Sequence, residues 1–474
     1  MPLSNAASQT QIQNRIEKDS LGEVRLPRDA LYGAQTQRAL ENFPISGRSI
    51  HPELIRAYLR LKWAAAVSNE TTGAISSEVS RLIQTAVNDL LAMPIASWKE
   101  FFPVDSHQAG AGTSSNMNVN EVIANLANVI AGSLLGSYKP VHPNDHVNRS
   151  QSTNDTFPTA MRMALVEASR ELWRELEKLA AALGSKARAW MHIPKSGRTH
   201  LQDAVPMMLG QEFAAYSLTV SRCARWIEQA RKEMMELGIG GSAAGTGLTV
   251  PDGYSEKIVH EISKLTGESF RLAPNLVESM QSQSPVMYYS STLRLMALEL
   301  TRICNDLRLM ASGPMTGLAE ILLPSVQPGS SIMPGKVNPS ILEMANQAWF
   351  AVLGEDQTVA YATQSGQLEL NVMMPIMAQS LLEATGIATA ALKTMRERAV
   401  EGMQPNEEKL RKYYESTPQV ATALSPRLGY AQTAELVKEA LAQGTSVLEL
   451  VRSRGLMPED ELRSLTDPHK LTGT

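Results

Sequence analysis

The sequence predicts an all-α protein, and three observations support this prediction. Hydrophobic residues make up 43% of the 474 residues, whereas aromatic residues make up only 5%. The core must therefore consist mainly of Leu, Ala, Ile, Val and the 23 Met residues, which favour or tolerate helices. Long stretches of the chain contain no proline, and their apolar residues recur with helical spacing.

The helical pattern is clearest after residue 170. Leu172, Leu176, Leu179 and Leu183 recur at i, i+4, i+7 and i+11 with charged residues between them, which predicts one face of a long helix. This face is longer than one subunit is expected to cover, so it favours association between subunits. In chain order, the proline-free stretches that predict further helices are 55–68, 212–237, 287–310, 341–352 and 378–402.

Proline and glycine gather in a few short segments, which predicts connections between the helices. The glycine run 238–247 is one of them, but it lacks the GxGxxG spacing and no strand pattern precedes it, so a nucleotide site is not predicted there. The other predicted connections are 194–197, 251–253 and 324–339.

Composition changes near residue 143 and near residues 402–405 divide the chain. We therefore predict a mainly helical N-terminal domain over 1–150, a central long-helix bundle over 151–405 and a small helical C-terminal domain over 406–474. Helices of 20 or more residues are about 30 Å long and commonly pack as near-antiparallel rods.

Charge and cysteine content exclude several classes of function. The formal net charge is −4, so a nucleic-acid-binding surface is not expected. Two cysteines, Cys223 and Cys304, cannot form a disulfide framework or a structural zinc site, which favours a reducing cytoplasm. No apolar stretch is long enough to be a signal peptide or to cross a membrane, so neither secretion nor membrane insertion is expected.

The most informative segment is GSSIMPGKVNP at residues 329–339, a loop with serine, lysine and asparagine between prolines and glycines. Its prolines forbid a continuous helix, so Lys336 and Asn338 are expected on an extended stretch where both can hold one carboxylate. Asn338 is also expected to cap a helix that starts at Pro339. The same residues are also compatible with a flexible surface connection that has no function.

This segment resembles the signature loop of the fumarase/aspartase superfamily, and four other segments resemble family stretches in the same order. The likeness extends from about residue 16 to about residue 471. The four segments are GAGTSSNMNVNE at 110–121, HPNDHVNRSQSTND at 142–155, GRTHLQDA at 197–204 and GQLELN at 366–371.

The resemblance implies an elongated homotetramer around a bundle of twenty long helices, five from each subunit. It also implies that each active site is assembled from three subunits and that the ligand is a small dicarboxylate. The reaction implied is a reversible anti-elimination, in which a base removes the proton next to one carboxylate and ammonia or water leaves from the neighbouring carbon. The resemblance implies no cofactor.

By motif, Ser330 would be the general base, and its alkoxide would form within a loop of backbone N–H groups. His200 would contact the substrate together with Thr199, and Glu343 of another subunit would fix the histidine tautomer. Lys336 and Asn338 would hold the substrate carboxylate at which negative charge develops.

The pocket for the other carboxylate and the leaving group would consist of Thr113, Ser152, Thr153 and Asn154. These polar residues also have purely structural explanations: Thr113 can cap a helix, and residues 152–154 can form a turn before a helix near Pro158. His200 can likewise be a core histidine whose ring nitrogens are hydrogen-bonded within the protein.

A second, peripheral anion site is associated in the family with the stretch that contains His142 and Asp145. A proline-rich turn next to a capping Asn or Asp explains the same two residues without a ligand. Magnesium stimulates some relatives, but the sequence has no recognisable cluster of magnesium ligands, so no metal site is predicted.

The leaving group is predicted to be ammonia from L-aspartate, and the alternative is the hydration of fumarate. Ala111, Thr153 and Gln367 differ from the residues usual in the water-handling branch, whereas Gly335 and the stretch TFPT at 156–159 resemble that branch. A third alternative is a structural protein without activity, because the superfamily includes eye-lens members. Such a protein could lose its catalytic residues without cost to folding, but Ser330 and its predicted partners are all present here.

Overall fold

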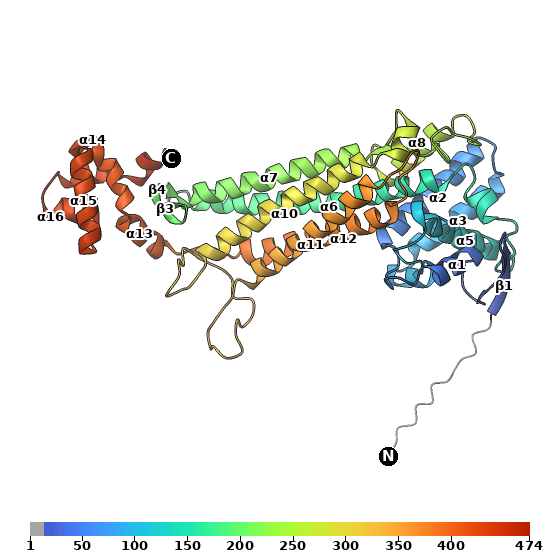
Figure 1. Cartoon of the computed structure of the whole chain (residues 1–474), viewed down its shortest axis with the longest axis horizontal. Coiled ribbons are helices and arrows are strands. Elements are labelled where there is room, and N and C mark those ends of the chain that lie inside the picture. Colours follow the sequence, from blue (N-terminus) through green and yellow to red (C-terminus); the bar gives the residue numbers. More distant parts are fainter. Residues whose placement is uncertain (1–13) are drawn as a thin grey trace, which may run out of the picture. The chain divides into compact units, whose positions relative to one another are not determined.

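Helices dominate residues 14–474, which are the part of the chain that this computed structural model describes (Figure 1). The predicted all-α class is confirmed. The helices before residue 200 are α1 (Ala34–Asn42), α2 (Pro52–Thr71), α3 (Ser77–Ala92), α4 (Trp98–Phe101), α5 (Thr113–Ile130) and α6 (Thr153–Ala189). The next are α7 (Leu209–Glu233), α8 (Tyr254–Thr266), α9 (Leu276–Gln281), α10 (Ser284–Met310), α11 (Ser340–Gln364) and α12 (Met374–Met395). The last are α13 (Glu407–Ser416), α14 (Ser425–Leu428), α15 (Tyr430–Gln443), α16 (Val447–Ser453), α17 (Glu459–Leu465) and α18 (Pro468–Thr472).

The strands of the described part are short and pair two by two. Two of these pairs are hairpins, β1 (Asn14–Asp19) with β2 (Gly22–Pro27) and β3 (Pro194–Thr199) with β4 (Gln202–Met208). The other pairs are β5 (Glu236–Leu237) with β6 (Arg271–Leu272), which is parallel, and β7 (Ile321–Leu322) with β8 (Gln404–Pro405), which is antiparallel.

The chain divides into two compact units. Unit 1 consists of 1–171, 227–294 and 353–386, of which 1–13 lie outside the described residues, and unit 2 consists of 172–226, 295–352 and 387–474. Each unit contains a segment of the long helices α6, α7, α10, α11 and α12. The predicted domain boundaries near residues 150 and 405 stay a prediction.

In unit 1, the bundle segments are joined by polar contacts as well as by apolar packing. The Arg231 guanidinium of α7 donates to the Val166 carbonyl of α6. The Ser290 hydroxyl of α10 donates to Asp356 of α11 at 2.6 Å, and the Tyr289 hydroxyl lies 2.9 Å from that of Thr385 in α12. Helix α2 packs against α3 and α8 in the same unit, and α3 packs against α5.

In unit 2, the predicted leucine face of α6 lies inside the subunit. Leu172, Leu176, Leu179 and Leu183 are all fully buried within this chain, so the expectation that this face needs a second subunit was wrong. Burying such an apolar face inside one chain is strongly favourable. The Ser217 hydroxyl of α7 also donates to the Ala180 carbonyl of α6.

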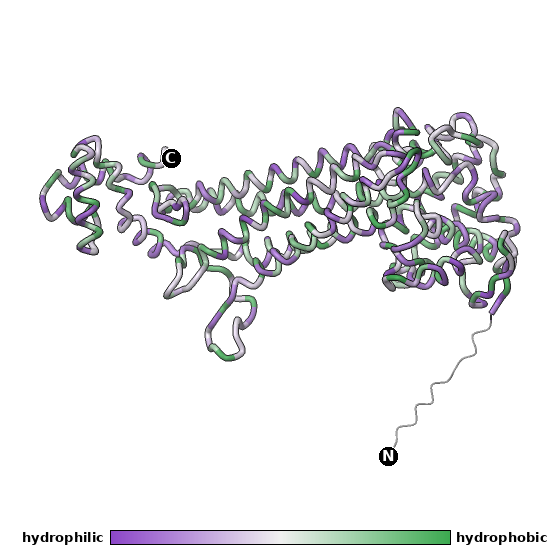
Figure 2. Tube along the Cα trace, viewed as in Figure 1, coloured by the Kyte–Doolittle hydropathy of each residue, from purple (hydrophilic) through white to green (hydrophobic). Residues whose placement is uncertain are grey.

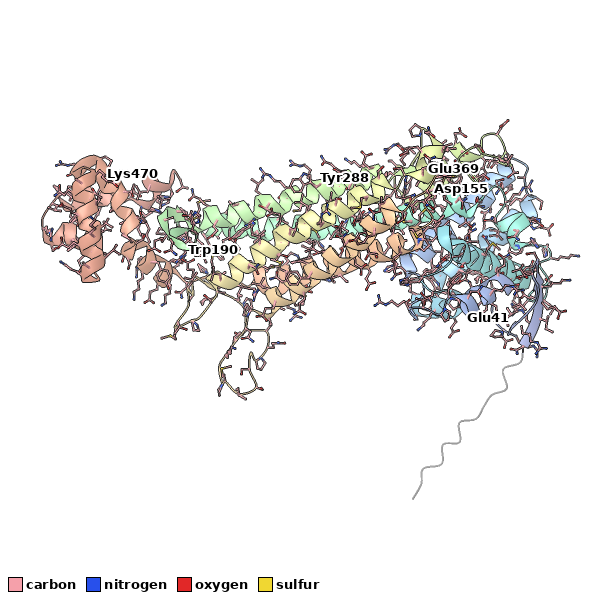
Figure 3. All side chains as sticks on the ribbon, in the orientation of Figure 1. Glu41, Asp155, Trp190, Tyr288, Glu369 and Lys470 are labelled. Atoms are coloured by element: carbon pink, nitrogen blue, oxygen red, sulfur yellow. The ribbon has the colours of Figure 1, made fainter. Side chains whose placement is uncertain are left out.

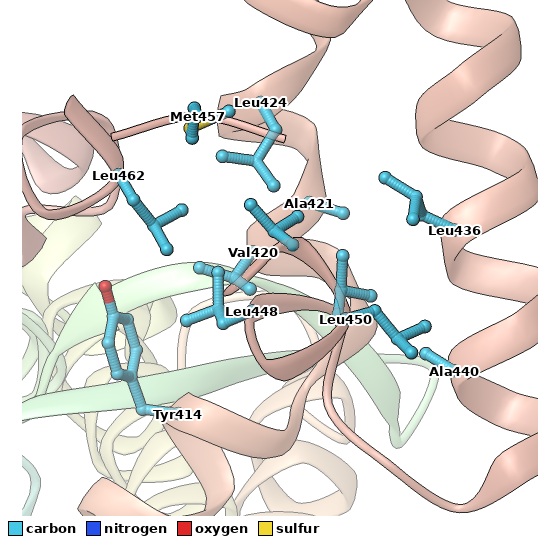
Figure 4. Close-up of a cluster of buried hydrophobic side chains, with 12 residues drawn as sticks. Tyr414, Val420, Ala421, Leu424, Leu436, Ala440, Leu448, Leu450, Met457 and Leu462 are labelled. Carbon is cyan, nitrogen blue, oxygen red and sulfur yellow. The ribbon is translucent and has the colours of Figure 1, made fainter. Parts of the chain in front are cut away.

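The last residues of unit 2 form a separate apolar cluster. Tyr414, Val420, Leu448 and Leu462 point toward one another from four different helical segments (Figure 4). The strands β3 and β4 contact three elements near this cluster: α13, α18 and the 3₁₀ helix Pro418–Leu424. The C-terminal helices therefore support the β3–β4 hairpin.

Several predicted boundaries differ from the structure. The helix predicted over 341–352 extends to Gln364, and the helix predicted over 212–237 ends at Glu233. The helix expected over 378–402 ends at Met395, and a π-helical turn over Arg396–Val400 follows it. Residues 194–197, predicted as a connection, belong to strand β3. Figure 2 shows hydrophilic and hydrophobic residues mixed along the helices, and no helix in residues 14–474 is both long and apolar enough to span a membrane.

Candidate active site

The predicted site residues divide between the two units. Unit 1 contains Thr113, the segment 152–154, His142 and Asp145, and unit 2 contains Thr199, His200, Ser330, Lys336, Asn338 and Glu343.

Thr113 is the first residue of α5 and is exposed. A tight turn precedes it, in which Ala111 and Gly112 have φ values of 59° and 84°. A Cβ at Gly112 would lie 1.9 Å from the Phe157 ring, so only glycine fits there. The Ala111 N–H donates to the Val372 carbonyl at 3.0 Å, which fixes the turn and with it the start of the helix.

Residues 152–154 form the start of α6. The helix begins at Thr153, earlier than expected for a helix near Pro158, because Ser152 and Asp155 together cap it. The Ser152 N–H donates to Asp155 Oδ1 at 2.9 Å, and the Asn154 N–H donates to Ser152 Oγ at 3.3 Å. Pro158 lies inside the helix at the cost of one hydrogen bond.

The side chains of this segment are held by neighbours in unit 1. Thr153 Oγ1 accepts a hydrogen bond of 3.2 Å from the Asn116 amide, one turn after Thr113 on α5. Thr113 and Thr153 are therefore brought to one region of unit 1. Asn154 Nδ2 donates to the Ala243 carbonyl at 2.8 Å, so the Asn154 Oδ1 atom is the one left to accept a bond from a ligand.

Thr199 and His200 lie at the tip of the β3–β4 hairpin in unit 2, where both are exposed. His200 and Leu201 form the two-residue turn, with φ values of 54° and 60°. Arg198 Nη1 contacts the fully buried Glu320 at 2.7 Å, and this contact anchors the hairpin. Lys195 contacts the same carboxylate at 3.1 Å.

Ser330 lies in the loop before α11 with its hydroxyl oxygen facing backbone donors. Its Oγ accepts bonds from the N–H groups of Ile332 at 3.2 Å and Met333 at 3.0 Å. Ser330 and Lys336 both line a hollow of about 470 Å³ in this loop. The arrangement favours negative charge on Ser330 Oγ, because oriented N–H dipoles and a nearby cation stabilise an oxyanion.

Asn338 does not cap the next helix as predicted. Its amide instead donates to the Gly329 carbonyl at 2.8 Å, and α11 begins at Ser340 with the Pro339 carbonyl as its first acceptor. Glu343 lies in the first turn of α11. Within residues 14–474, neither the His200 ring nor the Glu343 carboxylate has a hydrogen-bond partner in this chain.

His142 and Asp145 lie together at a π-helical turn over Pro143–Val147. His142 Nδ1 accepts bonds from the N–H groups of Asn144 and Asp145, and it lies 3.3 Å from the Asp145 carboxylate. The turn is capped, but by His142 and not by an Asn or Asp as predicted. His142 also lines a hollow of about 600 Å³ with Arg38 and Lys18. No cluster of metal-binding side chains occurs among residues 14–474.

Lys62, Asn116 and Asp155 support the predicted pocket but were missed from the sequence. A signal for Lys62 existed, since its helical neighbours Tyr58 and Ala65 are apolar and a charge there interrupts an apolar face. Asp155 lies within the motif at 142–155, but nothing in the sequence indicates that its carboxylate accepts backbone bonds from a distant loop.

Comparisons with known proteins agree over nearly the whole chain. Residues 22–354 match a family described as lyase, and residues 420–473 match the fumarase C C-terminal family. An aspartate ammonia-lyase from a Bacillus species is 42% identical, with 97% of each chain covered. A class II fumarate hydratase from Bacillus anthracis is 40% identical, with 97% of this chain and 99% of that protein covered.

Solved structures show the same fold. A structure named fumarate lyase:delta crystallin from Brucella melitensis, bound to cobalt, superimposes with a TM-score of 0.92 and 42% identity, covering 97% of this chain and 99% of that one. A class II fumarase from Schistosoma mansoni superimposes with a TM-score of 0.91 and 33% identity over the same shares.

Proposed function

The chain belongs to the fumarase/aspartase superfamily of lyases, and we propose that it catalyses the reversible elimination of ammonia from L-aspartate to give fumarate. The observation that carries the proposal is the Ser330 hydroxyl, which accepts two backbone N–H bonds in a hollow that Lys336 also lines. A serine is too weak a base at neutral pH unless its alkoxide is stabilised, and this environment supplies the stabilisation.

In the proposed mechanism, Ser330 Oγ takes the proton from the carbon next to one carboxylate. The electron pair of that C–H bond moves into the carboxylate, which becomes a doubly charged aci-carboxylate held by Lys336 and Asn338. When this intermediate collapses, the carbon–carbon double bond forms and the C–N bond breaks. The nitrogen leaves as ammonia with the electron pair of that bond.

The choice of ammonia over water depends on the proposed leaving-group pocket. An ammonium group has N–H donors only, so its binding needs acceptors. Asn154 offers its Oδ1 atom because its Nδ2 group is already bonded to the Ala243 carbonyl. Ala111 also lacks the hydroxyl that a water-handling site could use. Relatives of both activities match at similar identity, so these pocket residues decide the proposal.

We also propose a homotetramer in which three subunits contribute to each active site, with Glu343 of one subunit orienting His200 of another. Support comes from apolar side chains exposed on the helices of unit 2. Leu218, Leu295, Leu298 and Phe350 are 38–56% exposed, and a partner subunit packed on these helices would bury them. The two cysteines are free, buried thiols, which supports the proposed cytoplasmic location.

The decisive test is fumarate absorbance from equal concentrations of L-aspartate and L-malate, with ammonia assayed separately. We expect fumarate and ammonia in equal amounts from L-aspartate, at a higher rate than fumarate from L-malate. Fumarate from L-malate with no ammonia from L-aspartate would make the enzyme a fumarate hydratase. No reaction of either substrate by a correctly assembled protein would support the structural-protein alternative.

A further inference from the structure

Every residue of the segment 151–154 is held by a different partner inside unit 1. From these contacts we infer that the buried residues Lys62 and Asp155 are positioning residues, which fix this segment for substrate binding. The inference rests on the proposed function, which assigns Ser152, Thr153 and Asn154 to the substrate pocket. Neither Lys62 nor Asp155 is proposed to touch the substrate.

Asp155 lies at the start of α6 with no exposed surface (Figure 3). Its Oδ1 atom accepts the Ser152 N–H at 2.9 Å. Its Oδ2 atom accepts two more backbone bonds, from Gly240 at 3.1 Å and from Ser242 at 2.9 Å. One carboxylate therefore joins the segment 151–154 to the glycine run 238–247.

This arrangement gives the glycine run a role other than nucleotide binding. The run turns its N–H groups toward Asp155, and its Ala243 carbonyl accepts the Asn154 amide at 2.8 Å. Its conformation depends on glycine, since Gly240 and Gly245 have φ values of 93° and 87°. A Cβ at Gly245 would also lie 2.4 Å from the Val277 backbone. The run thus serves as a rigid support for Asn154 and Asp155.

Lys62 holds the other side of the segment from α2. Its ammonium has no exposed surface and donates to Asn148 Oδ1 and to Gln151 Oε1, both at 3.0 Å. Asn148 Oδ1 also accepts a bond from the Asn116 amide at 3.1 Å, and the same amide bonds to Thr153. Lys62 is therefore linked to both Gln151 and Thr153 through hydrogen bonds.

Lys62 and Asp155 also depend on each other electrostatically. Burial lowers the pKa of Lys62 to about 7 and raises the pKa of Asp155 to about 7, while the attraction between the two charges opposes both shifts. Removing one partner would take away this attraction and leave the other charge buried with its hydrogen bonds alone, whereas removing both would leave neither charge in the interior.

The test compares Asp155→Asn with Glu121→Gln by hydrogen exchange and by kinetics. Glu121 is a matched control, because it is also a buried carboxylate that accepts three backbone N–H bonds, from Gly33, Gln35 and Thr36. We expect amides of 148–156 to exchange at least about tenfold faster in Asp155→Asn and to be unchanged in Glu121→Gln. The substrate KM should rise by about tenfold or more in Asp155→Asn only.

If Asp155→Asn does not fold, the double variant Lys62→Met/Asp155→Asn takes its place, because it removes both buried charges together. Wild-type exchange of 148–156 and an unchanged KM in a folded variant would overturn the inference. Exchange is measured without substrate, so it decides the positioning role even if the wild-type protein acts on neither L-aspartate nor L-malate. That last result would contradict only the proposed function.

Discussion

The Asn338 amide donates to the Gly329 carbonyl at 2.8 Å and closes the base of the loop that carries Ser330. A second contact lies beside it, in which the Gly329 N–H donates to the Lys336 carbonyl at 2.8 Å. The proposed base and the proposed carboxylate-binding lysine are therefore connected at one point of the backbone. In this conformation the Asn338 Nδ2 atom stabilises the loop through its bond to the Gly329 carbonyl.

Gly329→Ala should open this contact and lower turnover by about tenfold or more. A Cβ at Gly329 would lie 2.6 Å from the Lys336 carbonyl oxygen, so the backbone segments around Gly329 and Lys336 must move apart. Gly335→Ala is the matched control, because its Cβ would enter open space although its φ of 78° adds strain. Steady-state kinetics of both variants check this prediction. Equal losses in the two variants would contradict it.

Ser330→Ala should fold and assemble but lose roughly 10²-fold or more of its turnover, since it removes the proposed general base. Ser331→Ala removes the neighbouring hydroxyl from the same exposed loop and should retain at least about ten times the activity of Ser330→Ala. Fumarate formation and light scattering are the measurements. A Ser330→Ala enzyme with more than about a tenth of wild-type turnover would exclude Ser330 as the base.

The long helices could be predicted because their apolar periodicity is local in sequence. The predicted stretch 287–310 lies within α10 (Ser284–Met310), and the prediction differs only at the start. Helix ends were less predictable where side-chain hydrogen bonds fix the turn before the helix. Ser152 starts α6 earlier than Pro158 suggested, and Asn338 bonds backward to Gly329 rather than forward to the next helix.

The β3–β4 hairpin could not be predicted from turn residues. A two-residue turn of this kind favours Asn-Gly, but His200 and Leu201 occupy it here. The hydrogen bonds of Lys62 and Asp155 were also beyond local reasoning, because their partners lie far away in sequence. The resemblance to a family supplied the candidate residues, whereas their supports became visible only in three dimensions.

Leu201→Gly should raise the free energy of unfolding by up to about 1 kcal/mol, because Leu201 has a φ of 60° that glycine adopts without strain. Leu201 is 72% exposed, so little packing is lost with its side chain. Leu201→Val is the opposite control and should lower stability by about 1 kcal/mol, since β-branched residues are strained at positive φ. Thermal unfolding of wild type, Leu201→Gly and Leu201→Val at one protein concentration measures these differences in stability. The prediction fails if glycine is the more destabilising substitution.

Asp105→Asn should destabilise the protein at pH 7 by about 1–3 kcal/mol. Burial raises the pKa of this carboxyl. Bonds from the His107 N–H, the Ser46 hydroxyl and the N–H groups of Ser46 and Gly47 outweigh burial and lower the pKa below its ordinary value of 3.8. A lowered folded-state pKa means that the carboxylate stabilises the protein above pH 3.8 and loses this effect as pH falls through the folded value.

The difference between wild type and Asp105→Asn should therefore shrink as the pH is lowered below about 4 toward 2. Urea unfolding at several pH values, with the protein concentration held constant, measures this difference. A difference that stays constant over this range would show that the Asp105 charge does not contribute. The variant also reports on the pocket, because the Asp105 carbonyl holds Gln108, and Gln108 holds Ser115 in the first turn of α5.

Mixing two inactive variants should restore activity if the proposed sites are shared between subunits. Ser330→Ala and His200→Ala each remove one proposed catalytic group, and both residues are at exposed or half-buried loop positions where alanine does not disturb the core. In a mixed tetramer, a site that takes Ser330 from one chain and His200 from another regains both groups. The control is the same mixture under conditions in which subunits do not exchange, and it should stay inactive.

Light scattering should show an assembly of four 51.7 kDa chains, and an active species of one chain would refute the tetramer. Exchange proven by mass labelling, with no recovered activity, would place Ser330 and His200 of each site on the same chain.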